Sequence, residues 1–269
     1  MKTRAVTSFF FVITILLSVF MGHYVFSAFY LLLSVFCLRE FYRIFRKSGM
    51  KPNMQSGILN CIVVYIILGL IAYQNSLFYH KLIFLLTLTI SALFIQELFR
   101  KSETPFGNIA LTLGGLVYVC LPFTFFHALA FIQGDFNFHY PLAFMLLLWG
   151  NDTGAYLFGI KFGRTKLFEK HSPKKTWEGF FGGVFTSGLV AGIISYFYKD
   201  LPWYHWLIVS VLICVFGTMG DLIESMFKRS IHVKDSGEIL PGHGGLLDRF
   251  DGLLIAAPIV YTYLYLILI

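Results

Sequence analysis

Long apolar segments, separated by short polar or glycine-containing breaks, follow one another along almost the whole chain. A helix needs about 20 apolar residues to cross the hydrocarbon core of a bilayer. Taking the charged and Gly/Pro breaks as boundaries predicts spans at about residues 5–22, 24–42, 56–73, 82–98, 108–132, 141–159, 179–198, 206–226 and 251–269. The predicted fold class is therefore all-α, a polytopic membrane bundle of about nine helices.

The composition agrees with this pattern. Hydrophobic residues make up 57% of the chain and charged residues only 13%, with a mean hydropathy of +0.74. These values exclude an ordinary soluble domain. Neither a Pro/Ser-rich linker nor a clear internal repeat interrupts the chain, so we expect one membrane domain over residues 1–269.

The basic residues indicate how the helices are oriented. If the N-terminus is cytoplasmic, 19 of the 21 lysines and arginines fall on the cytoplasmic side, and only Lys81 and Lys199 fall opposite. The net charge of +7 is then an orientation signal that also attracts anionic lipid, and it requires no nucleic-acid partner. The basic start and first apolar run also fit a secretory signal, an alternative that charge counting leaves open.

The inner end of the eighth predicted span carries an unusual set of polar residues. Asp221, Glu224, Ser225 and Lys228 follow i, i+3, i+4, i+7 spacing, which places them on one face of a helix. Such ionisable residues at membrane depth are expensive unless they are paired or bind a cation. One interpretation is structural ion pairing, such as Asp221 with Lys228; the other is a functional site.

Asp248 and Asp251 repeat the i, i+3 spacing where the ninth predicted span begins. Two carboxylate sets on consecutive helices can meet across a cation, which predicts a divalent-metal site. The alternative is local pairing of Asp248 with Arg249 and capping by Asp251. Just before them, the run from Pro241 to Gly245 can turn sharply and present N–H groups to an anion, although a plain turn fits as well.

Two further segments carry candidate residues. Ser172, Lys174, Lys175 and Thr176 directly precede the seventh predicted span and offer cations and hydroxyls to a polyphosphate, or form an ordinary basic flank. Asp152 lies roughly 17 Å into the sixth span, so we expect it to face the bundle interior and find a donor or a cation.

These residues together resemble the phosphatidate cytidylyltransferase family, also called CDP-diacylglycerol synthases. The resemblance rests on the signature Ser225-x-x-Lys228-Arg229, four residues, Lys234-Asp235, then Pro241-x-His243-Gly244-Gly245-x-x-Asp248-Arg249-x-Asp251. The segments that begin at Asp152 and Ser172 also look like family elements. The resemblance thus covers roughly the C-terminal two thirds, while residues 1–106 match only as apolar scaffold helices.

The resemblance implies an enzyme that transfers CMP from CTP to phosphatidic acid, giving CDP-diacylglycerol and pyrophosphate. It implies Mg²⁺, admits K⁺ as a second cation, and suggests a homodimer of the bacterial inner membrane with its site facing the cytoplasm. Residues 107–269 would be the catalytic helices and loops. The implied catalytic residues are Asp221, Asp248, Lys228 and Arg229, of which the two aspartates would hold the metal.

The implied substrate-binding residues are Ser172, Lys174, Lys175, Thr176, Ser225, Lys234, Asp235, His243 and Arg249. Asp152, Glu224 and Asp251 are further intramembrane acids without an assigned role. The role of His243, as a phosphate donor, a metal ligand or a loop residue, stays open.

Two alternatives remain. One is a CTP-dependent enzyme that acts on another membrane lipid phosphate or a polyprenol. The other is a cation-coupled transporter, which also places acids inside a helical bundle. The clustering of ionisable residues at one membrane face, without an inverted repeat, argues against transport.

Overall fold

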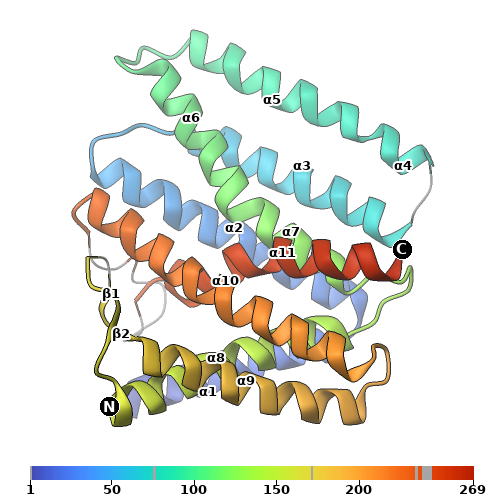
Figure 1. Cartoon of the computed structure of the whole chain (residues 1–269). Coiled ribbons are helices and arrows are strands. Elements are labelled where there is room, and N and C mark those ends of the chain that lie inside the picture. The colour runs from blue at the N-terminus through green and yellow to red at the C-terminus, as the bar shows by residue number, and fades with distance from the viewer. Residues whose placement is uncertain (1, 75–76, 171, 234–235, 238–243) are drawn as a thin grey trace. The chain divides into compact units, whose positions relative to one another are not determined.

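The computed structural model describes residues 2–74, 77–170, 172–233, 236–237 and 244–269, and it is built mainly of helices (Figure 1). The helical elements are α1 (Lys2–Phe20), α2 (His23–Lys47), α3 (Met54–Tyr73), α4 (Leu77–Lys81), α5 (Ile83–Leu98), α6 (Pro105–Gly115), the π-helical turn η1 (Leu116–Cys120), α7 (Leu121–Leu129), α8 (His139–Phe162), α9 (Trp177–Phe197), α10 (Trp203–Ser230), the 3-10 turn η2 (Leu247–Arg249) and α11 (Asp251–Leu268). Strands β1 (Lys166–Phe168) and β2 (Ser172–Thr176) form a small antiparallel hairpin. The all-α fold class is confirmed, and the hairpin is an addition that the apolar pattern did not predict.

Within the described residues, seven helical segments are long and apolar enough to cross a membrane. They are His23–Lys47, Met54–Tyr73, Phe78–Leu98, Pro105–Leu129, Trp177–Phe197, Trp203–Ser230 and Asp251–Leu268. The predicted count of nine is not confirmed. The apolar part of α1, Phe9–Phe20, is shorter, and α8 carries Asn151 and Asp152 in its middle. The chain nevertheless has the composition of an integral membrane protein.

The chain divides into two compact units. The first unit contains Met1–Asn137 and Val233–Arg249, so a late loop folds with the early helices. The second unit contains Phe138–His232 and Phe250–Ile269, which supply α8 to α10, the hairpin and α11.

Aromatic rings fill the core of the first unit. The ring centroids of Phe26 and Tyr30 on α2 lie 4.7 Å apart, and Tyr30 lies 4.8 Å from Phe126 on α7. The adjacent His127 accepts or donates a 2.7 Å hydrogen bond with Ser27 and stacks on Phe26. Buried aromatic pairs contribute about 0.5–1.5 kcal/mol each beyond the area they bury, so this cluster fixes α2 against α7.

Tyr42 on α2 joins the same core through close helix contacts. It is fully buried, and its hydroxyl donates a 2.7 Å hydrogen bond to the carbonyl of Thr112 on α6. The ring lies directly against Gly57 of α3 and Gly115 of α6, where a Cβ atom would collide with it. Small residues at these positions therefore permit the close approach that the aromatic side chain fills.

The second unit is also packed through small residues. A Cβ atom at Gly154 of α8 would meet Thr186 and the backbone of Gly182, both on α9. Gly220 of α10 lies against the backbone of Asp251 at the start of α11. These contacts bring the polar residues beside the glycines onto neighbouring helices.

The two adjacent glycines of α6 provide a matched test of this packing. A methyl group at Gly115 would lie within 3 Å of Tyr42 and Leu38, whereas a methyl group at Gly114 would meet nothing within 4 Å. We expect Gly115→Ala to destabilise the protein by about 1–3 kcal/mol, the usual cost of overpacking. Gly114→Ala should be neutral or slightly stabilising because alanine favours helix. Thermal unfolding of both variants in one detergent measures the difference, and equal stabilities would contradict the packing.

Candidate functional site

The C-terminal part of α10 carries the predicted polar stripe. Ser225 donates a 3.4 Å hydrogen bond to Asp221, and Lys228 forms a 2.9 Å ion pair with Glu224. Glu224 is 1% exposed, while the side chain of Asp221 is 38% exposed. The four residues share a face as the spacing predicted, and Lys228 forms its ion pair with Glu224, whereas the structural interpretation had paired it with Asp221.

Asp221 instead pairs with a residue from a distant segment. The ammonium group of Lys175 on β2 lies 2.5 Å from its Oδ2 atom. The two segments were predicted separately, one as a phosphate-binding stretch and one as part of a metal site. The ion pair shows that the fold brings them together within the second unit.

The hairpin and the start of α9 hold Lys175 in place. Thr176 is the N-cap of α9, and its hydroxyl accepts a 3.2 Å hydrogen bond from the N–H of Gly179. Glu178 accepts bonds from the N–H groups of Arg164 at 3.0 Å and Thr165 at 3.1 Å. Thr176, predicted as a substrate contact, thus caps a helix. This cap holds the backbone next to Lys175 in place.

Two more aspartates belong to this cluster. Asp251, at the start of α11, accepts a 2.7 Å hydrogen bond from the N–H of Gly252. Asp251 lies within electrostatic range of Asp221, Asp152 and Lys175, and Asp152 interacts with Asp221 and Lys175 in turn. We call Asp152, Asp221, Asp251 and Lys175 the carboxylate cluster.

Asp152 on α8 was predicted to face the bundle interior and to find a donor or a cation, and it lies within electrostatic range of Lys175 and Asp221. Its side chain is exposed, although Asn151 donates a 3.5 Å bond to it. Gly150 and Gly154 pack against α9, and Asp152 lies two residues from each, about 200° around the helix. It therefore points away from α9 and remains accessible.

Asp248 belongs to a separate arrangement in the first unit. Its Oδ2 atom accepts hydrogen bonds from the N–H groups of Ser236 at 3.2 Å and Gly245 at 3.0 Å. Gly244 has a φ of +81°, a left-handed conformation that favours glycine. The carboxylate of Asp248 thus organises the backbone at Ser236 and in the turn of residues 244–247, which together we call the signature loop.

Glu40 supports the same loop and was not predicted. It lies on α2, is 2% exposed, and accepts a 2.7 Å hydrogen bond from the N–H of Leu247. A Cβ atom at Gly237 or Gly245 would collide with its carboxylate, so both glycines leave it room. An acid within an apolar span was the available signal, but residues 1–106 were predicted only as scaffold helices.

The other predicted residues occupy varied positions. Lys174, Arg229 and Arg249 are exposed, and Ser172 is half-buried on β2. Lys234, Asp235 and His243 lie outside the described residues.

The carboxylate cluster carries the donor type of a divalent-cation site but not a ready-made set of ligands. Carboxylate oxygens are the donors that Mg²⁺ prefers, and Lys175 is a cation within electrostatic range of all three aspartates. No group of three or more His, Cys, Asp or Glu side chains among the described residues is close enough to form a ready-made metal site. The predicted pair of Asp221 and Asp248 falls in different units, so their joint role stays a prediction.

Comparison with known proteins identifies a matching family model and several related proteins. A family model described as the cytidylyltransferase family matches residues 2–267. A protein named phosphatidate cytidylyltransferase from Staphylococcus haemolyticus is 35% identical over 262 residues, 97% of each chain. Proteins of that name from Staphylococcus aureus and Staphylococcus epidermidis are 42% and 43% identical over 162 residues, which is 60% of each chain. The chain therefore belongs to the cytidylyltransferase family.

Proposed function

We propose that this protein transfers the cytidylyl group of CTP to phosphatidic acid, giving CDP-diacylglycerol and pyrophosphate. Family membership and the printed names of the relatives support the reaction. The structural observation that carries the proposal is the ion pair between Lys175 and Asp221, with Asp152 and Asp251 within electrostatic range. It joins a cation suited to phosphate with carboxylates suited to a metal.

The reaction is a displacement at phosphorus. A phosphate oxygen of phosphatidate forms a bond to the α-phosphorus of CTP, and the bond from that phosphorus to the bridging oxygen breaks. Pyrophosphate leaves with the electron pair. Because phosphatidate is already ionised at neutral pH, no general base is required, and the main task is to bring two anions together.

The basic residues divide into two proposed groups. Lys174 and Lys175 contact the triphosphate from the hairpin, with Ser172 as a hydroxyl donor. Arg229 and Arg249, both exposed, contact the lipid phosphate or pyrophosphate. Lys228 acts on the same side, oriented by its ion pair with Glu224.

The remaining signature residues complete this proposal. Ser225 holds Asp221 through its hydrogen bond, and Lys234, Asp235 and His243 are assigned to the substrates by resemblance alone.

Mg²⁺ is part of the proposal. Asp221 and Asp248 would hold it, with Asp152 and Asp251 as neighbouring acids, and K⁺ is the proposed second cation. The metal would neutralise phosphate charge and stabilise the departing pyrophosphate. The carboxylate oxygens of these residues support this assignment. Because Asp248 already accepts two backbone hydrogen bonds, its part in holding the metal is the one that must be tested.

One assay tests both the reaction and the cluster. Purified protein in detergent, given labelled CTP and phosphatidate with Mg²⁺, should form a lipid-linked cytidine product, and a chelator should stop it. Asp221→Asn keeps the side-chain size but removes the charge, so turnover should fall about a hundredfold, as expected if nearly 3 kcal/mol of transition-state stabilisation is lost.

Asp200→Asn is the matched control because Asp200 pairs with His139 and lies outside the cluster. It should keep turnover within about twofold. Product formation from a polyprenyl phosphate but not from phosphatidate would sink the proposed substrate. Equal turnover in Asp221→Asn and the wild type would remove Asp221 from the mechanism.

The support of the signature loop by Glu40 can be separated from simple folding. Glu40→Gln weakens a charged hydrogen bond to the Leu247 N–H, a bond of a kind that contributes about 1.5–3 kcal/mol. We expect kcat to fall about tenfold or more while the KM for CTP changes little. Tyr42→Phe, a buried change two positions along the same helix, should leave kcat within about twofold. A loss of thermal stability with an unchanged kcat would reduce Glu40 to a folding role.

We also propose that the protein lies in the inner membrane with its N-terminus and its site on the cytoplasmic side. The cytoplasm supplies CTP. The basic asymmetry of 19 residues to 2 supports this orientation. Single cysteines at the exposed positions Lys47 and Lys170, in a cysteine-free background, should be protected from an impermeant reagent in intact cells. A cysteine at Gln133 should be labelled, and the reverse pattern would invert the topology.

A homodimer is proposed from the resemblance alone. Mass measurement of the protein in detergent would test it.

A further inference from the structure

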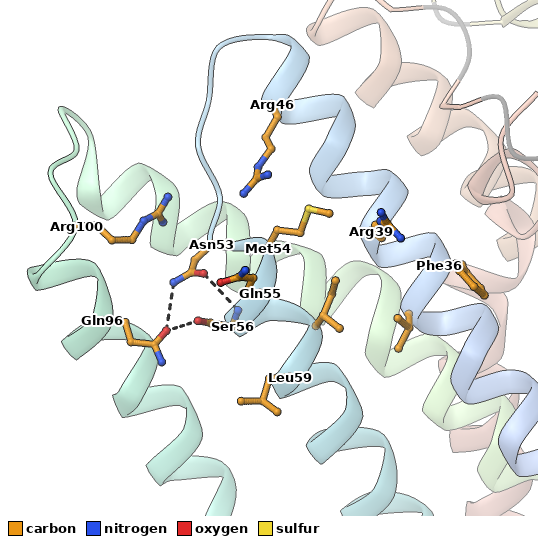
Figure 2. A pocket seen from close by; sticks show the side chains of 12 residues that line it. Phe36, Arg39, Arg46, Asn53, Met54, Gln55, Ser56, Leu59, Gln96 and Arg100 are labelled. Carbon is orange, nitrogen blue, oxygen red and sulfur yellow. Dashed lines mark hydrogen bonds between the residues drawn. The ribbon is translucent and has the colours of Figure 1, made fainter.

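A cavity of about 1020 Å³ lies in the first unit between α2, α3 and α5 (Figure 2). It lies where α2 and α5 end and α3 begins, so the same end of all three helices surrounds it. None of its lining residues belongs to the carboxylate cluster or to the signature loop. The cavity is therefore a separate feature that the proposed reaction does not explain.

Three arginines line this cavity: Arg39 and Arg46 from α2, and Arg100 just beyond α5. Figure 2 shows the guanidinium groups of Arg46 and Arg100 directed toward the space above Asn53. Arg100 pairs with the buried Glu97 at 2.6 Å. The guanidinium groups of Arg39 and Arg46 form no ion pair or hydrogen bond with any residue that the structure describes. Their guanidinium groups are available to bind an anion.

The polar floor of the cavity is ordered by hydrogen bonds. Asn53 caps α3 by accepting from the N–H of Ser56 at 3.3 Å, and its amide donates to Gln96 at 3.3 Å. The hydroxyl of Ser56 also donates to Gln96, as the dashed lines in Figure 2 show. The beginning of α3 is thereby held beside the arginines, where its helix dipole also favours an anion.

One side of the cavity is apolar and exposed. Phe36 on α2 is 44% exposed and Leu59 on α3 is 58% exposed, and both line it. Leu32 and Ile66 continue these two helix faces by one and two turns, and both are also exposed. The cavity therefore has arginines at one end and an apolar wall that continues along the membrane-spanning helices α2 and α3.

We propose that this cavity binds the headgroup of an anionic phospholipid from the surrounding membrane. Arg39 and Arg46 contact the phosphate, Arg100 and the amide side chains border it, and an acyl chain lies along Phe36 and Leu59. A soluble anion would use only the arginines and leave the apolar wall unused. A phospholipid matches both the charge and the wall, which favours it as the occupant.

Binding can be measured without any turnover, so the result is independent of the proposed reaction. The full chain in a zwitterionic detergent is titrated with dioleoylphosphatidylglycerol or dioleoylphosphatidylcholine, and bound lipid is measured by native mass spectrometry. We expect at least tenfold tighter binding of the anionic lipid. Arg39→Gln with Arg46→Gln should weaken that binding about tenfold, whereas Arg43→Gln with Lys47→Gln should change it less than about twofold.

The control pair is matched because Arg43 and Lys47 are exposed on the same helix but do not line the cavity. A second comparison tests the wall: Leu59→Ser should weaken lipid binding, whereas Leu88→Ser on an exposed part of α5 should not. Thermal unfolding verifies that all variants are folded.

Equal losses in the two double variants would show only general surface charge and overturn the proposal. Displacement of the lipid by an equal concentration of inorganic phosphate or glycerophosphoglycerol would also overturn it, because it would assign the cavity to a soluble anion. Failure of both soluble compounds to compete supports the lipid.

Discussion

A carboxylate inside an apolar helix must find a partner within the protein, because burying it unpaired costs several kcal/mol. Glu40, Glu97 and Glu224 are each 1–2% exposed, and each meets this constraint differently. Glu40 accepts the Leu247 N–H, Glu97 pairs with Arg100 and accepts from Asn108, and Glu224 pairs with Lys228. These contacts fix a loop, the end of a helix and a lysine, so satisfying the buried acids also arranges the polar groups around them.

Asp221 is different because it is only partly enclosed. Its side chain is 38% exposed, and its ion pair with Lys175 is 27% exposed on the lysine side. A partly exposed pair is held less firmly than a buried one and can exchange partners when a more highly charged ligand arrives. This contrast separates acids that stabilise the fold from the acid that suits binding chemistry.

The sequence predicted the helices well because length and apolarity decide whether a segment can span a membrane. It also identified Lys175 and Asp221 as functional candidates. It did not predict that they pair, because their contact depends on a hairpin formed by polar residues without a strong β pattern. The sequence placed Asp152 in a helix but did not show which face of that helix packs on α9, a choice that depends on the contacts of Gly150 and Gly154. Glu40 was missed because its partner lies 207 positions away.

The charge balance of the second unit links the fold to the chemistry. Close contact between Gly220 of α10 and the start of α11 brings Asp221 near Asp251, and Asp152 adds a third acid within electrostatic range. Lys175 forms its ion pair with Asp221, and ionised carboxylates at this site repel a triphosphate and a lipid phosphate. Bringing both anions to this site therefore requires additional positive charge. In the proposed mechanism, the exposed Lys174 and Arg229 would provide part of it from neighbouring elements, and a divalent cation would supply the rest of the charge between carboxylates and phosphates.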